Sequence, residues 1–240
     1  MTLTLGTGSL STRTDGTLLQ HDYGGGTFVQ PYPRRLRALA GGHTIVDTER
    51  ARMLHGPDGP PAVWVPREDI DLNLVSTSQL VSPPQGDDPV SDALRGFVLL
   101  PMDQAERWFI EDEPVYSHIK DPYHRVDVVA SSRHVLVRYG NGILAETRRP
   151  KLLYETGLPV RYYLPWADVR LDRLTLSDTV SECPYKGDGQ HWHLEASSGR
   201  VENVAWSLPH PLPEGAAARE HVCFYVNRVE VIVGGQLIEA

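Results

Sequence analysis

Short stretches of alternating apolar and polar residues, separated by turns, recur along most of the 240-residue chain. VLVRY and ILAET alternate on either side of the turn GNG, which predicts a β-hairpin over residues 135–147. Further strand candidates are LLYE, VRYYL, TVSE, WHLEA, NVAW, HVCFYV and RVEVIV. Helices are expected only as brief segments, around Pro89–Leu94 and Gly215–Glu220. The pattern predicts a mainly β fold of short antiparallel strands with few short helices.

Composition supports this fold class. Nineteen prolines and 21 glycines are spread along the chain, and this favours many short strands joined by turns over a helical bundle. Hydrophobic residues make up 40% of the chain and charged residues 22%, which is ordinary for a soluble protein with one large core or two small ones.

An internal repeat suggests two cores. GGHTIVDTERARMLHG from Gly41 aligns with GNGILAETRRPKLLYE from Gly140, a shift of 140 − 41 = 99 positions. VWVPREDIDL aligns with YYLPWADVRL at the same shift. A second match pairs SHIKDPYHRVDVV with EHVCFYVNRVEVI at 221 − 118 = 103 positions. We therefore expect an N-terminal arm over 1–33, partly flexible, a degenerate first domain over 34–132 and a second domain over 133–240.

Charge and cysteine content exclude several protein classes. A net charge of −8 opposes a nucleic-acid-binding surface, because such binding relies on clustered Lys and Arg. Residues 1–20 lack a signal-peptide pattern, and no segment is apolar enough for a membrane span, so a cytoplasmic protein with no membrane partner is expected. Cys183 and Cys223 form no CxxC pair, and reduced thiols are the simplest expectation.

Several ordered motifs carry a family resemblance. RPKLLYETGLPVRYYLPWADVRLDRL, CPYKGDGQHWHL, VAWSLPHPLPE and HVCFYVNRVEV resemble the bacterial DUF427 family, named for lacking an assigned function. The match spans 133–240 and is weaker over 34–132. The resemblance implies a β-tent fold, in which two small antiparallel sheets meet at an angle. Some β-tent relatives hold zinc through paired CxxC knuckles, which this chain lacks, so neither a metal nor a cofactor is expected.

A nucleotidyltransferase label is sometimes attached to this family. The sequence gives it no support, because it contains neither a Gly-rich phosphate loop nor the paired acidic metal ligands that phosphoryl transfer needs.

The motif CPYKG places Cys183 three residues before Lys186 in a turn. A cationic neighbour can lower a thiol's pKa, so this pair is a candidate for nucleophilic catalysis, with Lys186 stabilising developing negative charge. The alternative is a buried cysteine with Lys186 covering the turn.

Glu155 and Arg161 bracket the turn in ETGLPVR. They are expected to form either a structural ion pair or a site in which Arg161 clamps a carboxylate or phosphate while Glu155 acts as general base. The first copy carries Gly56, Ala62, Ser82 and Gln85 at the positions of Glu155, Arg161, Cys183 and Lys186. The joint absence of the four polar groups favours a shared site in the second copy, although general drift of the first copy is an alternative.

The remaining candidates are aromatic and histidine side chains. Ligand-binding roles are predicted for Arg161, Tyr163, Tyr185, Trp192, Trp206, His118 and His124. Core packing is the alternative for the tryptophans, and interdomain hydrogen bonding is the alternative for the histidines. His191 and His193 share one face of a strand, but no third ligand accompanies them, so they are expected to face solvent.

These residues predict a small-molecule site in the second domain, near the domain junction. The expected ligand is an anionic metabolite, and the protein is either a binding protein or a cofactor-independent enzyme with Glu155, Cys183 and Lys186 as catalytic groups. The alternative is a structural or interaction scaffold in which the same motifs are folding determinants.

Overall fold

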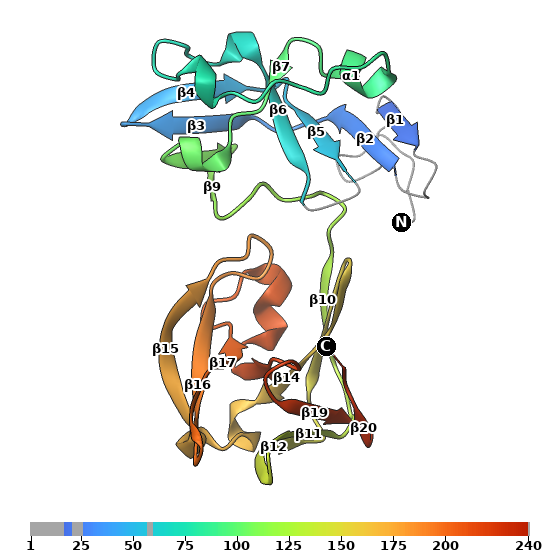
Figure 1. The fold of residues 1–240 in the computed structure, drawn as a ribbon, viewed down its shortest axis with the longest axis vertical. Helices are drawn as coiled ribbons and strands as arrows, with labels where there is room; N and C mark the ends of the chain where they lie inside the picture. Colours follow the sequence, from blue (N-terminus) through green and yellow to red (C-terminus); the bar gives the residue numbers. More distant parts are fainter. Residues whose placement is uncertain (1–16, 21–25, 57–59, 240) are drawn as a thin grey trace. The chain divides into compact units, whose positions relative to one another are not determined.

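The computed structural model describes residues 17–20, 26–56 and 60–239. Contacts divide the chain into two compact units, the first ending at Tyr123 and the second beginning at His124. The predicted mainly β fold is confirmed, with several antiparallel sheets and few short helices (Figure 1). No helix in these described ranges is long and apolar enough to cross a bilayer.

The described residues of the first unit form two antiparallel sheets. The larger has the order β1-β2-β5-β6-β7, with β1 Thr17–Gln20, β2 Gly26–Pro31, β5 Arg52–His55, β6 Ala62–Pro66 and β7 Phe97–Val98. The smaller has the order β4-β3-β8-β9, with β3 Leu36–Ala40, β4 His43–Thr48, β8 Arg107–Ile110 and β9 Glu113–Val115. Its helices are α1 Pro89–Ala93 and the 3-10 segments η1 Arg67–Asp69, η2 Thr77–Gln79 and η3 Met102–Gln104.

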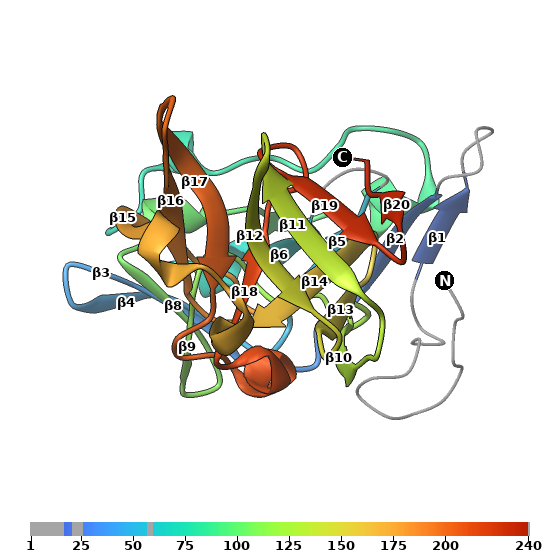
Figure 2. The same cartoon turned by 90° about the horizontal axis from the view of Figure 1, so that it is seen from below.

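The second unit also pairs a larger sheet with a smaller one. The larger has the order β10-β13-β14-β18-β17-β16-β15, with β10 Val126–Ala130, β13 Lys151–Glu155, β14 Leu158–Pro165, β15 Leu174–Ser181, β16 Gly189–Ala196, β17 Gly199–Ser207 and β18 His221–Phe224. The smaller has the order β12-β11-β19-β20, with β11 Val135–Tyr139, β12 Gly142–Thr147, β19 Glu230–Val233 and β20 Gln236–Leu237 (Figure 2). The 3-10 segments are η4 Trp166–Asp168, η5 Leu171–Arg173 and η6 Pro213–Ala218.

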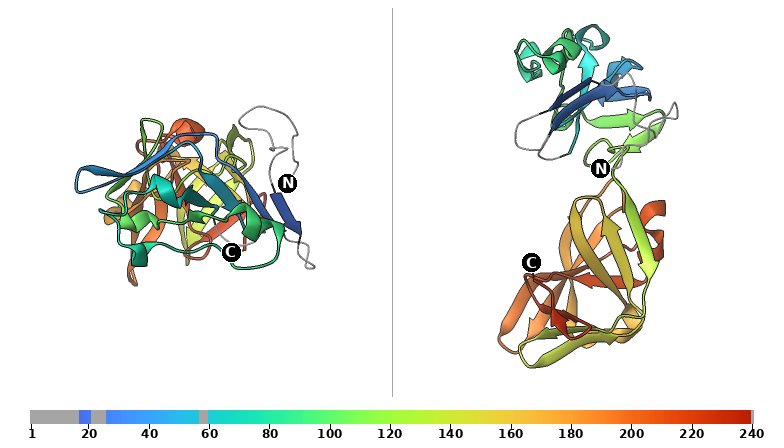
Figure 3. Two further views of the ribbon diagram at one scale, coloured as in Figure 1. Left: turned by 90° about the horizontal axis from the view of Figure 1, so that it is seen from above. Right: turned by 90° about the vertical axis from the view of Figure 1, so that its right-hand side faces the viewer.

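The seven-stranded sheet of the second unit is covered differently on its two faces. On one face, Leu164, Ala205 and Phe224 pack against Val137 and Val231 of the smaller sheet in the main core. On the other face, Tyr163 and Cys223 form a second core with Leu208 and with Ala218 of η6. Side chains of the edge strand β10 pack against this core. Figure 3 (right) shows η6 in orange-red next to β10 in light green. The second face carries the side chains of Arg161, Trp206 and His191, which are described below.

The same contacts recur in both units at a spacing of 99 residues. The Thr48 hydroxyl donates to Asp69 at 2.6 Å, and the Thr147 hydroxyl donates to Asp168 at 2.7 Å. The hairpin β3–β4 changes register after Ala38, and the hairpin β11–β12 changes register after Val137. Identical side chains therefore make identical local contacts in each unit.

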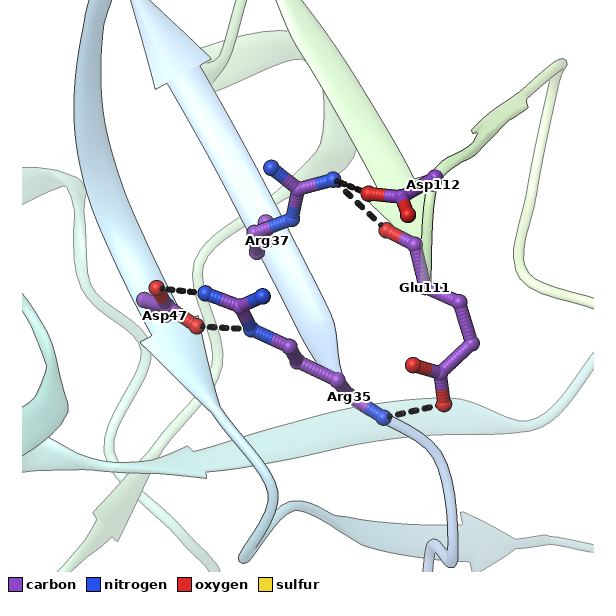
Figure 4. Close-up of polar contacts among 5 residues, drawn as sticks. All are labelled: Arg35, Arg37, Asp47, Glu111 and Asp112. Atoms are coloured by element: carbon purple, nitrogen blue, oxygen red, sulfur yellow. Dashed lines mark hydrogen bonds and ion pairs between the residues drawn. The ribbon is translucent and has the colours of Figure 1, made fainter.

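An ion-pair network fixes the smaller sheet of the first unit (Figure 4). Arg35, directly before β3, binds Asp47 on β4 through two hydrogen bonds, while Arg37 on β3 donates to Asp112 at 2.6 Å. The Arg35 guanidinium lowers the pKa of the Asp47 carboxyl by hydrogen bonding. At the corresponding position of the second unit, His134 contacts Glu146 at 2.7 Å. A polar side-chain contact thus links the two arms of the hairpin in both units.

Two expectations need correction. Residues 1–33 were expected to form an arm, yet β2 pairs with β5 inside the larger sheet; residues 1–16 and 21–25 lie outside the described ranges. The match at a shift of 103 equates β10 with β19, but β10 pairs with β13 and β19 pairs with β11. The position of β10 corresponds instead to that of β2, since Val128 pairs with Leu153 as Val29 pairs with Leu54.

Candidate functional site

A row of side chains crosses the second face of the seven-stranded sheet. Tyr163 on β14 lies opposite Cys223 on β18, Cys223 lies opposite Trp206 on β17, and Trp206 lies opposite His191 on β16. Directly paired residues point to the same face of a sheet. Four neighbouring strands therefore bring together two aromatic rings, a thiol and an imidazole that are far apart in sequence.

Arg161 lies on this face, two residues before Tyr163 on the same strand. Its guanidinium carbon is 5.5 Å from the centre of the Trp206 ring, a cation–π distance. The Trp206 ring is held in place, because its N–H donates to the Tyr163 hydroxyl at 3.0 Å and its ring centre lies 4.3 Å from that of Tyr225. In the described part of the chain, Arg161 makes no ion pair or hydrogen bond with a carboxylate.

Tyr163 and Cys223 form the buried floor beneath this cluster. Tyr163 is 1% exposed and Cys223 is 0% exposed, and burial raises the pKa of both groups, so both stay protonated near neutral pH. Tyr163 therefore positions Trp206 and offers solvent no surface of its own. Burial also raises the pKa of Tyr225.

Glu155 is the centre of a second cluster, at the end of β13. Its side chain is 5% exposed, and its two carboxylate oxygens are bonded to the Lys186 ammonium and, at 3.0 Å, to His124 Nε2. The His124 ring stacks on Tyr185, with 4.1 Å between ring centres. The expected Glu155–Arg161 ion pair is thus replaced by a Glu155–Lys186 pair.

The turn CPYKG positions Lys186. The Gly187 N–H donates to the Cys183 carbonyl at 2.9 Å, and the Lys186 carbonyl accepts from the Leu212 N–H at 3.0 Å. Gly187 has φ of +92°, and a Cβ there would lie 2.8 Å from the His210 carbonyl oxygen, so this position requires glycine. The half-buried Cys183 thiol has no hydrogen bond or ion pair within the described ranges, and the ammonium expected to activate it binds Glu155.

The sequence did not predict a role for His191, Ser181 or Tyr225 on this face. The expectation that His191 faces solvent is wrong, because it is 6% exposed. Its Nε2 lies 3.0 Å from the Ser181 hydroxyl, and its ring stacks on Tyr225. Burial lowers the pKa of His191, and its buried Nδ1 has no hydrogen-bond partner among the described residues. Alternation along HVCFYV, which puts Cys223 and Tyr225 on one face, was the signal available in the sequence.

Two of the predicted residues, Trp192 and His118, lie elsewhere. Trp192 pairs with Ala205, so its ring faces the main core, on the opposite side of the sheet from Trp206. His118 belongs to the first unit, where its Nδ1 lies 3.0 Å from the Ile119 carbonyl oxygen. His193 accepts the Asn203 N–H at 3.1 Å. In the residues that the structure describes, no three His, Cys, Asp or Glu side chains gather as a metal site.

Comparison with known proteins places the chain in a family. The family model described as "Domain of unknown function (DUF427)" matches residues 28–85 and 127–235, and the second match includes Glu155, Arg161 and Lys186. A search of curated proteins found no match. Because the family model matches more than half of the sequence, the chain belongs to the DUF427 family, as its motifs predicted.

Proposed function

We propose that the second unit binds a small anionic metabolite on the Arg161 face, which we define as Arg161, Trp206, Tyr225 and His191. The observation that supports this proposal is a half-buried guanidinium that stacks on an aromatic ring and has no carboxylate partner in the described chain. Guanidinium groups bind carboxylate and phosphate through two parallel hydrogen bonds, so the missing partner is assigned to the ligand.

Unlike Arg161, five arginines of the second unit form ion pairs within the described chain. Carboxylates of the same chain neutralise Arg125, Arg138, Arg149, Arg170 and Arg200. All five pairs lie in exposed or partly exposed positions, where an ion pair contributes about 0–1 kcal/mol. Arg161, by contrast, is held against Trp206 in a partly desolvated setting, where its charge acts on a ligand more strongly than it would in water.

The neighbouring charges favour an anion as well. Lys186 and Glu155 compensate one another, which leaves the Arg161 charge as the net charge of these three groups. The chain as a whole carries a net charge of −8, and Arg161 would supply the local positive charge that attracts an anion. Trp206 and Tyr225 would pack against the apolar part of the ligand.

We assign Glu155 a positioning role within this proposal. Both of its oxygens are already bonded, so abstracting a proton would cost it the Lys186 or His124 contact. Catalysis by Glu155, Cys183 or Lys186 stays a prediction, as does a purely structural role for these motifs.

We further infer that the two units are copies of one domain and that the first copy does not bind this ligand. Ala62 of β6 lies opposite Leu54 as Arg161 lies opposite Leu153, so the first unit has a methyl group in place of the guanidinium. A cytoplasmic location fits the two free cysteines, and the net negative charge argues against a nucleic-acid partner.

Thermal stabilisation of the full-length protein tests the proposal. A panel of phosphate, phosphomonoesters, aliphatic carboxylates and aromatic carboxylates would be compared on the wild type, Arg161→Gln and the matched control Arg170→Gln. We expect at least one anion to raise the melting temperature of the wild type and of Arg170→Gln but not that of Arg161→Gln. Equal stabilisation of all three proteins, or stabilisation of none by any anion, would favour the scaffold instead.

A further inference from the structure

A cavity of about 380 Å³ opens on the other side of the seven-stranded sheet from Trp206. Its walls are mostly apolar and include Trp166, Trp192 and Leu171, and its polar groups are Ser207, Glu220 and His221. This volume suits a ligand of one or two rings, and apolar walls with a few convergent polar groups are typical of small-molecule sites.

The two tryptophans form a rigid corner. Their ring centres are 5.0 Å apart and their planes meet at 65°. The Trp192 N–H donates to the Ser207 hydroxyl at 3.0 Å, which fixes the orientation of that ring. Leu171 is 54% exposed although it is apolar and lines the same cavity. The corner therefore offers a planar ring two aromatic surfaces and an aliphatic one that the protein's own side chains leave uncovered.

Glu220 lies at this cavity in an unfavourable backbone conformation. Its φ is +62°, a region that costs a residue with a Cβ about 1 kcal/mol or more, and such strain is concentrated at ligand clamps and active sites. Its backbone carbonyl accepts the backbone N–H of Trp166 at 3.3 Å, so the main chains of the strained residue and of the tryptophan are held together. The exposed Glu220 carboxylate has no ion-pair partner in the part of the chain that is described.

We propose that this cavity binds a planar aromatic ring that carries a protonated amine. The ring would pack into the corner of Trp166 and Trp192, and the ammonium would meet the Glu220 carboxylate at the edge of the indoles. A ring that carries a carboxylate would be repelled by Glu220. The proposal is independent of the Arg161 face, because it concerns the opposite face of the sheet and a ligand of opposite charge.

Titration of the ¹⁵N-labelled full-length protein with phenethylamine tests the proposal. The indole N–H signals of Trp166 and Trp192, assigned with Trp166→Phe and Trp192→Phe, should shift and saturate, whereas the Trp206 signal should not move. Phenylacetate, which has the same ring and the opposite charge, should bind at least about tenfold more weakly.

The variant Glu220→Gln removes the charge while it keeps the side-chain size, and the matched control is Glu202→Gln, an exposed acid that does not line the cavity. We expect Glu220→Gln to weaken phenethylamine binding about five- to tenfold and Glu202→Gln to leave it unchanged. The proposal is wrong if phenethylamine moves neither indole signal, if phenylacetate binds equally well, or if Glu220→Gln binds like the wild type. A spectrum of Glu220→Gln with wild-type dispersion shows that the variant is folded.

Discussion

At the scale of single residues, the two cations Lys186 and Arg161 of the second unit have different partners. Lys186 is bonded to the Glu155 carboxylate, and both side chains are largely buried, at 16% and 5% exposure. Arg161 stacks on Trp206 instead and faces no carboxylate of the described chain. Lys186 therefore stabilises the folded structure, whereas Arg161 is the cation to which we assign ligand binding.

This difference predicts unequal costs of mutation. Lys186→Met leaves a buried carboxylate without its cation and should destabilise the protein by about 3 kcal/mol in urea unfolding. Glu155→Gln/Lys186→Met removes both charges and should recover most of that loss. Arg161→Gln breaks no ion pair and should cost less than about 1 kcal/mol. A double variant as unstable as Lys186→Met would contradict the prediction, because the unpaired Glu155 carboxylate would then not be the cause of the loss.

His191 gives a prediction about pH. Burial lowers its pKa, so below pH about 6.5 the unfolded chain takes up a proton that the folded protein does not. The stabilisation from neutral His191 is complete above that pH and is lost as the pH falls towards the folded-state pKa. His191→Gln should therefore lose less free energy of unfolding between pH 7.5 and pH 5.5 than the wild type does. The exposed His210→Gln is the control, and it should follow the wild type.

The sequence predicted most of the residues that lie together in the two clusters but not all of their contacts. Glu155, Arg161, Tyr163, Trp206, Lys186 and His124 were predicted, and all lie in or beside the two clusters. Glu155 was paired with Arg161 because the two are close in sequence. Lys186, 31 positions away, takes that place because the turn 183–187 is tied to Leu212, a long-range contact with no local signal.

At the scale of secondary-structure elements, local patterns predicted the hairpin and two helical segments but missed the short 3-10 segments η1 to η5. The predicted hairpin corresponds to β11 and β12, and the brief helices correspond to α1 and η6. The order of strands across the seven-stranded sheet was not predicted, because β18 lies between β14 and β17 although it follows them in sequence. This non-local insertion is what brings Cys223 and Tyr225 beside Trp206.

The turn that carries Lys186 should be sensitive to a single methyl group. Gly187→Ala adds a Cβ at positive φ that meets the His210 carbonyl oxygen, and we expect it to destabilise the protein by about 2 kcal/mol or more. Gly199→Ala, also at positive φ but with nothing within 4 Å of the new Cβ, should cost less. Equal losses in thermal unfolding would mean that the close contact contributes nothing.

At the scale of the whole molecule, each unit has hydrophobic clusters of its own. The clusters around Met53 and Trp64 lie in the first unit, and those around Leu164 and Tyr163 lie in the second. A fragment of residues 124–240 contains both sheets and both clusters of the second unit. It should therefore fold alone, with a cooperative unfolding transition and dispersed amide signals. A fragment that lacks these properties would show that the second unit depends on the first.

The indole spectrum of the full-length protein tests the central claim most directly. An anion that stabilises the protein would be titrated into the ¹⁵N-labelled protein, and the Trp206 signal would be assigned with Trp206→Phe. Because the Trp206 ring contacts both Arg161 and Tyr225, binding should shift its N–H signal in the wild type and leave it unmoved in Arg161→Gln. Binding that leaves the Trp206 signal in place, or that persists in Arg161→Gln, would contradict the account.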